Sequence, residues 1–546
     1  MSAGIAGEAV TPGEVYHAAP EPDGGPAPVR EVTSAAASAR FAGREDVVRA
    51  KGRFAVVHRD MTPHEAMVAD LLAVRSVLED AGIAYLLVRG NDARPVIAVG
   101  WELRKKLRSA LVEAFQDEPF YSLTVDARKD KALLVADGQL ATSTKARMFR
   151  LYRPRIDTEG HLHYGQGTGV QIELWKWDDD GNLQLPIENS LTRATVPAGE
   201  VVRGTVKRFG LEWPTIENMF ADHATDIDFP IDIVFSWVDG NNPGFQRYRA
   251  SFMEHAVVGE GDDAEARYRQ IDELKYALRS VHMFAPWIRH IFICTDSEPP
   301  AWLDPEHPGI TVVRAADHFK DPSVLPTFNS QAVEAQLQHV AGLSEHFLYS
   351  NDDMFFGRPL GPDMFFSPGG ITKFVEAGTR IGLGDNHLDR SGFENAARVN
   401  RRLLHDRFGR ITTRHLEHTA APLRRSVLLE MEEVFAAEFA ATAASRFRAK
   451  DNISVTNSLY HYYALLTGRA VTKVGAKVKY VDTTMYSGLD SLGKLLRKRN
   501  QDFFCLNDGS FPEVGARERQ ERVVGFLERY FPIPAPWERR EAPGGT

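Results

Sequence analysis

The chain has 546 residues, of which 43% are hydrophobic and 25% charged, so it is long enough to bury large cores and predicts two or three globular domains. Its formal net charge of -9 argues against nucleic acid as a bulk partner, because binding to a phosphate backbone needs a basic surface. The two cysteines, Cys294 and Cys505, form neither a CxxC pair nor a zinc-ligand spacing, which argues against a disulfide framework.

The sequence predicts neither a membrane span nor a signal peptide. No run of about 18 apolar residues occurs, and the N-terminus lacks a basic segment followed by an apolar one. We therefore expect a cytoplasmic protein, with a peripheral position at the inner face of the plasma membrane as the alternative. Residues 1–43 are rich in Ala, Gly, Pro and Glu, which predicts a flexible tail.

Residues 44–222 have the pattern of an N-terminal α/β or α+β domain. A capping box at Thr62–Glu65 begins a helix whose apolar residues recur at helical spacing until Gly82. A second helical pattern covers 101–115, and short apolar runs predict strands at 83–88, 132–135 and 170–175. The role of this domain stays open.

A second domain begins after a linker at 222–230. The β-branched and aromatic run Ile231–Gly240 predicts its first strand, followed by an Asn-Pro-Gly turn. A strand that ends in such a loop lets the backbone approach a nucleotide. Trp237 then either covers a base or sugar, or lies at the edge of an ordinary core.

Helices and strands alternate in the next stretch. A helix is predicted over 267–281, with Lys275 and Arg279 on a face that meets phosphates or solvent, and strands follow at 290–296 and 310–313. This alternation predicts a parallel, doubly wound sheet. Asn329 is expected to cap a helix that runs through Val340.

The organising stretch of this domain is the aromatic run 345–356, which carries Asp352 and Asp353. The pattern predicts a buried strand, and open α/β sheets present ligands at the carboxyl ends of their strands. Adjacent carboxylates in an apolar setting suit a hard cation such as Mg²⁺ together with the phosphates that it bridges. The alternative is a turn with two exposed acids.

Several blocks of the second domain resemble the Stealth family of sugar-phosphate transferases. That family includes bacterial capsular-polysaccharide phosphotransferases and the lysosomal-enzyme GlcNAc-1-phosphotransferase. The resemblance covers about Asp228 to Asp508, in the order expected for the family, and one departure is Phe235-Ser236, where Tyr-Thr is more usual. The matching blocks are 231–240, 272–280 with 285–289, 342–355, 418–426, and 485–489 followed by 503–508.

The resemblance implies a GT-A or Rossmann-like catalytic domain that transfers a hexose-1-phosphate, with GlcNAc-1-phosphate as one candidate. The donor would be a UDP-sugar, the acceptor a saccharide hydroxyl and the released product UMP, in capsule or exopolysaccharide synthesis. By motif position the catalytic candidates are Glu334, Asp353, His418 and Arg448. The expected nucleotide contacts are Trp237, Val238, Asp239, Gly240, Arg279 and Asp296.

The chemistry of phosphoryl transfer explains why these residue types are expected in the site. Phosphoryl transfer depends on positioning and charge neutralisation, so Asp353 with Asp352 would hold Mg²⁺ or Mn²⁺, and Arg448 would bind phosphate oxygens. A neutral His418 suits the removal of the acceptor proton. Glu334 would orient that base or contact the acceptor, although by pattern alone it is a surface acid. The alternatives kept open are Arg446 for the arginine and His405, His415 or His461 for the base.

We therefore expect a catalytic domain over 228–510, followed by a C-terminal helix and tail over 511–546. The helix is predicted at 517–530, and the Pro-rich remainder is expected to fray. Two other functions stay in view: a metal-dependent GT-A-like glycosyltransferase that releases UDP, and a noncatalytic polysaccharide-binding protein. The transferred hexose, the acceptor and the linkage stay open.

Overall fold

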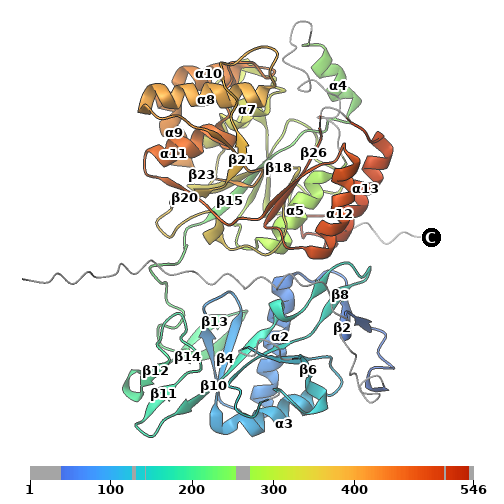
Figure 1. The fold of residues 1–546 in the computed structure, drawn as a ribbon, viewed down its shortest axis with the longest axis vertical. Coiled ribbons are helices and arrows are strands. Elements are labelled where there is room, and N and C mark those ends of the chain that lie inside the picture. The colour runs from blue at the N-terminus through green and yellow to red at the C-terminus, as the bar shows by residue number, and fades with distance from the viewer. Residues whose placement is uncertain (1–38, 126–130, 142, 254–270, 510–511, 540–546) are drawn as a thin grey trace, which may run out of the picture.

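The computed structural model describes residues 39–125, 131–141, 143–253, 271–509 and 512–539. Figure 1 shows two parts, with the N-terminal elements below and the elements from β15 onward above. They are not separate at their junction, because Leu162 and Tyr164 share an apolar cluster with Leu274 of the upper part. Arg499 also donates to the His161 carbonyl oxygen at 3.4 Å. The predicted domain boundaries stay predictions.

The N-terminal part is α+β. Its helices are α2 (Pro63–Asp80) and α3 (Arg104–Ala114). Its strands are β1 (Val47–Ala50), β2 (Arg53–His58), β3 (Tyr85–Arg89), β4 (Pro95–Gly100), β5 (Tyr121–Thr124), β6 (Leu133–Leu134), β7 (Met148–Tyr152), β8 (Arg155–Asp157), β9 (His163–Tyr164), β10 (Val170–Trp177), β11 (Asn182–Gln184), β12 (Thr195–Pro197), β13 (Arg203–Arg208) and β14 (Leu211–Ile216).

The largest N-terminal sheet has the order β12-β11-β10-β7-β5-β6, and the β3–β4 hairpin joins it through a parallel pairing of β4 with β10. The capping box is confirmed, since the Thr62 hydroxyl accepts from the Glu65 amide at 3.2 Å and Glu65 accepts from the Thr62 amide at 2.8 Å. The stripe of α2 that includes Leu71 and Val74 packs with α3 in one core.

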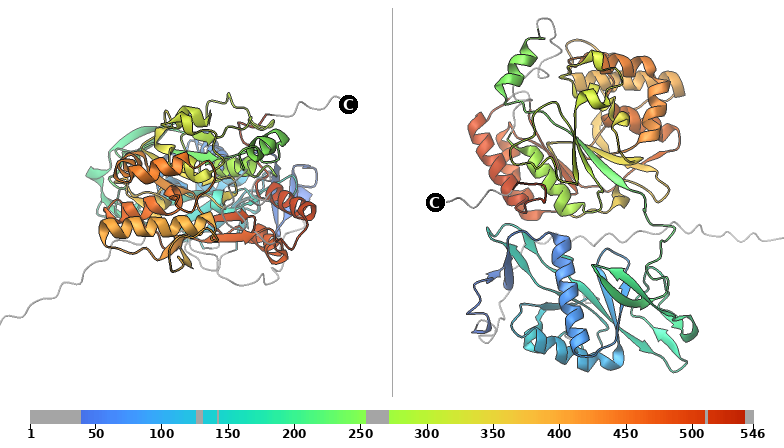
Figure 2. Two further views of the ribbon diagram at one scale, coloured as in Figure 1. Left: turned by 90° about the horizontal axis from the view of Figure 1, so that it is seen from above. Right: turned by 180° about the vertical axis from the view of Figure 1, so that it is seen from behind.

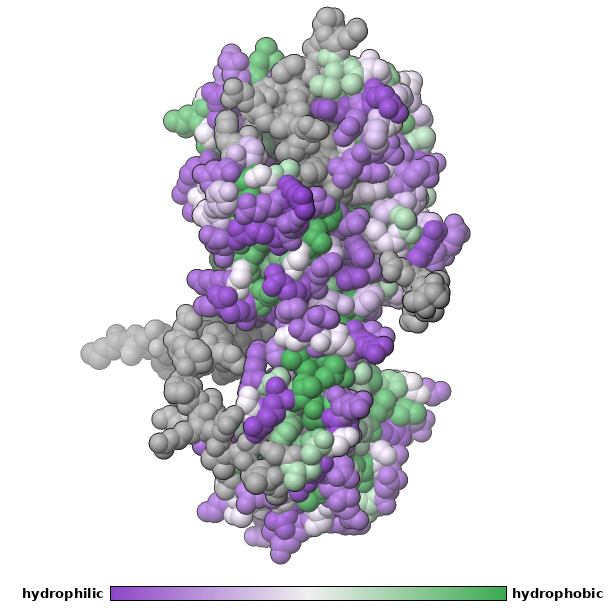
Figure 3. Space-filling view, turned by 90° about the vertical axis from the view of Figure 1, so that its right-hand side faces the viewer, coloured by the Kyte–Doolittle hydropathy of each residue, from purple (hydrophilic) through white to green (hydrophobic). Residues whose placement is uncertain are grey.

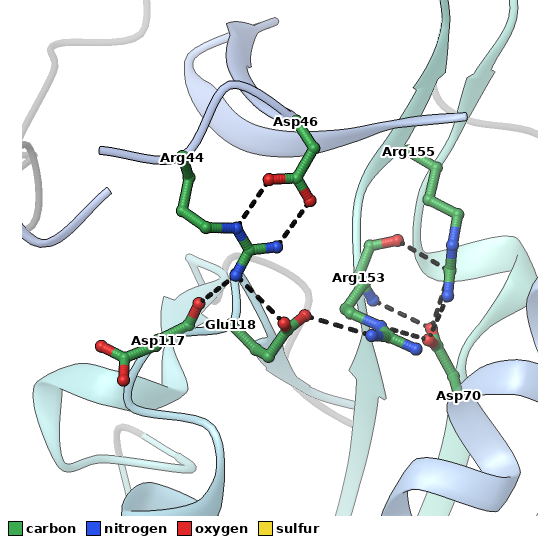
Figure 4. A network of polar contacts seen from close by, with 7 residues as sticks. All are labelled: Arg44, Asp46, Asp70, Asp117, Glu118, Arg153 and Arg155. Carbon is green, nitrogen blue, oxygen red and sulfur yellow. Dashed lines mark hydrogen bonds and ion pairs between the residues drawn. The ribbon is translucent and has the colours of Figure 1, made fainter. Parts of the chain in front are cut away.

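A buried ion cluster ties α2 to β8 (Figure 4). The Asp70 carboxylate, which is 0% exposed, accepts from Arg155 Nη2 at 2.6 Å and from Arg153 Nε at 2.8 Å. Glu118 extends the cluster by accepting from Arg153 at 3.1 Å and from Arg44 at 3.1 Å. Buried charges are tolerated when they are paired in this way.

The upper part is built on the sheet β17-β16-β15-β18-β23. Its helices are α4 (Pro243–Ala250), α5 (Glu273–Phe284), α6 (Ala315–His318), α7 (Ser330–Glu334), α8 (Gly392–Phe408), α9 (Arg425–Val434), α10 (Ala436–Ala444), α11 (Tyr460–Leu466), α12 (Tyr486–Lys498) and α13 (Ala516–Tyr530). Its strands are β15 (Ile231–Ser236), β16 (Ile291–Cys294), β17 (Ile310–Val313), β18 (His346–Asn351), β19 (Met354–Phe356), β20 (Thr372–Phe374), β21 (Glu376–Arg380), β22 (Arg414–Leu416), β23 (Ala421–Arg424), β24 (Ala470–Thr472), β25 (Val478–Asp482) and β26 (Phe503–Asn507).

The predicted parallel, doubly wound sheet is confirmed. Strands β17, β16, β15 and β18 run parallel, and β23 adds an antiparallel edge. Ile233 belongs to the cluster that includes α5, α12 and α13, whereas the next residue, Val234, belongs to the cluster that includes α9 and α11. Helices therefore cover both faces of the sheet, as Figures 1 and 2 show. The strand order reverses between β15 and β18, which makes this the switch point where such folds bind ligands.

Two expectations for this part were wrong. The helix capped by Asn329 ends at Glu334 and is followed by a separate 3-10 turn at Leu337–His339, so it does not run through Val340. Residues 531–539, the described part of the Pro-rich segment, do not fray, because their apolar side chains, including Phe531 and Trp537, are buried in the main core, whereas residues 540–546 lie outside the described residues. The start of the helix predicted at 267–281 lies outside the described residues.

The surface seen in Figure 3 is mostly polar over the upper part, with apolar residues gathered more densely over the N-terminal part. Among the helices that the structure describes, none has the length and apolar character needed to cross a bilayer.

Candidate active site

A cavity of about 950 Å³ opens at the carboxyl ends of β15, β16 and β18. These strands deliver Trp237, Asp296 and the Asn351–Asp353 turn to its wall. The structure therefore brings most of the sequence-predicted site residues to one place. Those that line the cavity are Trp237, Val238, Asp296, Asp352, Asp353, His418 and Arg448.

Asp239 and Gly240 lie in the same loop but shape it instead of lining the cavity. The Asp239 amide donates to the Ser297 hydroxyl at 2.9 Å, which ties the loop after β15 to the loop after β16. The Gly240 carbonyl accepts from Gln246 Nε2 at 2.9 Å. These contacts hold in place the loop that carries Trp237 at the carboxyl end of β15.

Arg279 is not brought to the cavity. Its Nε and Nη2 donate to the Glu538 carboxylate, both at 2.7 Å, and its Nη1 donates to the Phe531 carbonyl oxygen at 2.9 Å. The basic face of α5 therefore binds the C-terminal segment. Because the partner lies about 250 residues away in sequence, the helical pattern alone gave no signal of this contact.

The cavity wall is strongly acidic. Arg448 is the only Lys or Arg among the lining residues that the structure describes, whereas the lining acids are Glu273, Asp296, Glu298, Asp352, Asp353, Glu417 and Asp508. Burial, followed by the charge of Asp352, raises the pKa of Glu273 to about 8. An anionic ligand would meet repulsion in such a site unless cations accompanied it.

Glu273 is a site residue that the sequence reasoning missed. In the sequence Glu273 is only an acid in the first turn of a predicted helix, a position that the helix dipole favours in any helix. Its Oε2 accepts from the Ile271 amide at 2.8 Å, which holds the carboxyl at the start of α5 beside the Asp352–Asp353 turn.

The residues fit a hard cation in chemistry, although the geometry supplies only part of a ligand set. Within the described ranges, no group of three or more His, Cys, Asp and Glu side chains is arranged to hold a metal ion. Asp352 and Asp353 are adjacent oxygen donors next to a carboxyl whose pKa they raise. Mg²⁺ is commonly held by one or two carboxylates together with substrate phosphates.

Asp353 is fixed by the neighbouring strand β26. Its Oδ2 accepts from the Cys505 thiol at 3.4 Å, and its backbone carbonyl accepts from the Leu506 amide at 3.0 Å. Cys505 and Cys294 are both free and buried, in line with the expectation of no disulfide framework. Burial and the nearby Asp353 raise the pKa of Cys505, so this thiol stays protonated and donates.

Glu334 is buried, and its expected surface position was wrong. The side chain is 3% exposed and lies at the end of α7, where it accepts from the Thr456 hydroxyl at 2.7 Å. Burial raises the pKa of Glu334, while the charge of Arg448 opposes that effect. The short helix explains the error, because α7 ends where the chain enters the core.

Arg448 points toward the same helix. Its Nη2 donates to the Ser330 hydroxyl at 2.9 Å, at the start of α7. The alternative, Arg446, does not line the cavity and donates instead to the Pro326 carbonyl oxygen at 3.0 Å. Between the two arginines, the geometry favours Arg448 as the ligand-binding one.

Of the four histidines considered as a base, His418 lines the cavity. Burial, with His415 nearby, lowers the pKa of His418 and keeps the ring neutral at neutral pH. His461 is buried, bonds to the Thr456 carbonyl oxygen at 2.9 Å and has a pKa lowered to about 4 by burial. His415 stacks on Phe393 at 4.6 Å, and His405 is exposed.

Family models match three segments of the chain. They are Stealth protein conserved region 2 over residues 267–374, conserved region 3 over 417–465 and conserved region 4 over 493–545. The active-site candidates Glu334, Asp353, His418 and Arg448 all fall within the first two matches.

Three relatives that match most of the chain are named exopolysaccharide phosphotransferases. The chain is 60% identical to the exopolysaccharide phosphotransferase CpsY of Mycobacterium tuberculosis, with 90% of this chain and 92% of that protein covered. It is 55% identical to an exopolysaccharide phosphotransferase of Nocardia farcinica, covering 88% of each. It is 36% identical to the exopolysaccharide phosphotransferase SCO6021 of Streptomyces coelicolor, covering 88% and 92%.

Two solved structures of glycosyltransferases are distantly similar to the chain. The galactosyltransferase LgtC is 15% identical, with 56% of this chain and 96% of that chain covered and a TM-score of 0.28. The bifunctional glycosyltransferase WbbM is 10% identical, with coverages of 55% and 50% and a TM-score of 0.30. The fold assignment therefore rests on the strand order described above.

Proposed function

The chain belongs to the Stealth family of exopolysaccharide phosphotransferases, a group of transferases, and from that premise we propose the reaction in detail. A hexose-1-phosphate passes from a UDP-sugar to a saccharide hydroxyl, and UMP leaves. The observation that carries this proposal is the cavity at the switch point of the sheet. A carboxylate pair, an arginine and a neutral histidine all line it. Those are the parts that phosphoryl transfer requires.

The nucleotide end of the donor fits the rim formed by the loops after β15 and β16. Trp237 and Val238 line this rim together with Asp296, and the hydrogen bond that the Asp239 amide donates to the Ser297 hydroxyl holds the two loops together. We assign the uridine to this rim, since the carboxyl ends of parallel strands at a switch point are where such folds bind nucleotides.

Asp352 and Asp353 would hold Mg²⁺ or Mn²⁺ at the pyrophosphate, where the cation would supply neutralisation of the phosphate charge. The acidic lining of the cavity supports this assignment, because the donor is anionic and would be repelled unless a cation accompanied it. The thiol of Cys505 and the amide of Leu506 keep Asp353 in place. Such preorganised charge avoids the cost of rearrangement during the reaction.

Transfer requires a bond from the acceptor oxygen to the β-phosphorus, cleavage of the bond between that phosphorus and the bridging oxygen, and removal of the hydroxyl proton. His418, neutral because burial lowers its pKa, accepts that proton. Arg448 binds the phosphoryl oxygens with its guanidinium group. Glu334, buried at the end of α7 and bonded to the Thr456 hydroxyl, acts as a positioning residue that holds Arg448 by charge, while Ser330 accepts a hydrogen bond from Arg448.

A second candidate uses the same cavity. A GT-A-like glycosyltransferase would bind the same donor and metal but break the bond between the anomeric carbon and oxygen, so that UDP leaves. Arg448 and His418 line the same cavity as the carboxylate pair, and this set favours attack at phosphorus, because a neutral base and an arginine serve a hydroxyl that attacks a phosphoryl group.

The proposal is tested with a panel of UDP-sugars, each incubated with saccharide acceptors and Mg²⁺ or Mn²⁺, and with mass spectrometry of the acceptor product. We expect an acceptor-dependent product that carries hexose plus phosphate, and no product from Asp353→Asn. Glu298→Gln is the matched control, because Glu298 lines the same cavity and its side chain is 90% exposed. A product that gains hexose alone would favour the glycosyltransferase.

A further inference from the structure

An exposed aliphatic tip lies at one end of the antiparallel β21–β22 ladder, outside the cavity. Arg380 pairs with Arg414 in this ladder, and the Ile381 amide donates to the Thr413 carbonyl oxygen at 3.1 Å. Leu383 and Ile411 lie just beyond this end of the ladder, three residues after Arg380 and three residues before Arg414. Leu383 is 88% exposed and Ile411 is 65% exposed. Two large aliphatic side chains are thus exposed to solvent at the same end of one ladder.

Arginines support this tip from α8 and from its own loop. Arg390 donates to the Leu383 carbonyl oxygen at 3.3 Å, and Arg401 donates to the Gly384 carbonyl oxygen at 3.2 Å. Arg402 donates to the Asn386 side-chain oxygen at 3.2 Å. Three guanidinium groups therefore lie along the backbone that carries Leu383.

The charge of this region is opposite to that of the whole protein. Between residues 380 and 414 the sequence has eight arginines against four acids, although the complete chain has a net charge of -9. The acids include Asp385 and Asp389, which are exposed in the loop of the tip. The arginines Arg402, Arg407 and Arg410 are exposed as well, so the surface around the tip is basic.

We propose that this tip, Leu383 and Ile411 with the arginines around it, docks the protein onto an anionic lipid surface. Aliphatic side chains ringed by basic residues suit an interface in which the apolar groups enter the acyl boundary and the cations meet lipid phosphates. A saccharide would instead favour exposed aromatic rings, and a purely anionic polymer would gain nothing from a bare leucine.

The position of the tip gives the docking a consequence. Ser391 and Phe393, which follow the tip loop, and Leu416, which ends β22, all line the cavity. A membrane contact at Leu383 and Ile411 therefore holds the cavity beside the lipid surface, where an acceptor attached to lipid is presented. The docking itself rests on the tip and not on the reaction proposed above.

The test is flotation of the full chain with vesicles of phosphatidylcholine alone or of phosphatidylcholine with phosphatidylglycerol. We expect binding to the anionic vesicles that weakens as salt rises, and that falls on the order of tenfold or more in Leu383→Asp/Ile411→Asp. Val202→Asp is the control, because Val202 is 49% exposed on the N-terminal part. It should bind as the unmodified protein does.

Several outcomes would overturn the proposal. One is failure of the unmodified protein to bind anionic vesicles, and another is equal binding by the double variant. Loss of a dimer in the double variant, seen by light scattering without vesicles, would assign the tip to self-association instead. Because neither substituted residue lines the cavity, turnover with a water-soluble acceptor should not change, so that failure of docking and failure of the proposed reaction are distinguishable.

Discussion

Glu273→Gln should stabilise the metal-free protein, and increasingly so as the pH rises. The carboxyl has an ordinary pKa of 4.5 and a folded-state pKa of about 8, because burial and then Asp352 disfavour its charge. Below about pH 4.5 the group is protonated in both the folded and the unfolded state, so it has no effect on stability there. Above that pH the unfolded state loses its proton first, and the folded protein loses stability until the pH passes about 8.

The size of the effect follows from the two pKa values. At about 1.4 kcal/mol per pKa unit, ionising Glu273 costs the folded state up to about 5 kcal/mol at pH 9 and only about 1 kcal/mol at pH 5. Glutamine keeps an oxygen that accepts from the Ile271 amide but cannot ionise. We compare the free energy of unfolding of the variant with that of the unmodified protein. This difference should be larger at pH 9 than at pH 5, by up to about 4 kcal/mol.

The assay is urea unfolding in EDTA at pH 5, 7 and 9, followed by tryptophan fluorescence. Glu298→Gln is the matched control, since Glu298 lines the same cavity with a side chain that is 90% exposed, and it should shift stability equally at all three pH values. A difference between Glu273→Gln and the unmodified protein that does not change with pH would refute the reasoning. It would mean that Glu273 titrates normally beside Asp352.

Four further substitutions test the assigned roles. Asp353→Asn should remain folded and lose metal-dependent activity, and full turnover of the unmodified enzyme in excess EDTA would contradict the metal assignment. His418→Ala should lower kcat by roughly 10²–10⁴-fold with little change in donor affinity, and near-normal kcat at saturating substrates would exclude His418 as the base. Arg448→Ala should raise the donor KM and also lower kcat, because a phosphate-binding guanidinium acts in both the ground and transition states; kinetics of the donor series measure this. Asp70→Asn should cost about 3–5 kcal/mol in urea unfolding, because it leaves the buried Arg155 uncompensated, and a loss under 1 kcal/mol would show that water enters the cluster.

Local signals in the sequence predicted much of the fold. The capping box before α2 and the apolar β-branched runs of β15 and β18 are set by neighbouring residues, and they appear where expected. The parallel order of the sheet followed from the alternation of helix and strand. The position of Asp352 and Asp353 at the switch point could be predicted, because they follow the end of a strand and the sequence pattern defines where that strand ends.

The contacts that could not be predicted from the sequence join residues that are far apart in the chain. Glu334 is at the surface by helical pattern, yet α7 ends at that residue and Thr456 covers it. Arg279 binds Glu538 and not a phosphate, and no spacing on one helix reveals a partner in the C-terminal segment. The raised pKa of Glu273 comes from its burial and then from the charge of Asp352, and both arise from tertiary packing, since Asp352 lies 79 positions away in the sequence.

The most direct test of the proposed reaction is the identity of the nucleotide that leaves. A UDP-sugar accepted by the enzyme is incubated with acceptor and Mg²⁺, and the released nucleotide is quantified by chromatography against the acceptor product. Attack at the β-phosphorus predicts UMP in equal amount to the phosphorylated acceptor, and none of it with Asp353→Asn. Release of UDP in step with product would contradict sugar-phosphate transfer and assign the cavity to glycosyl transfer.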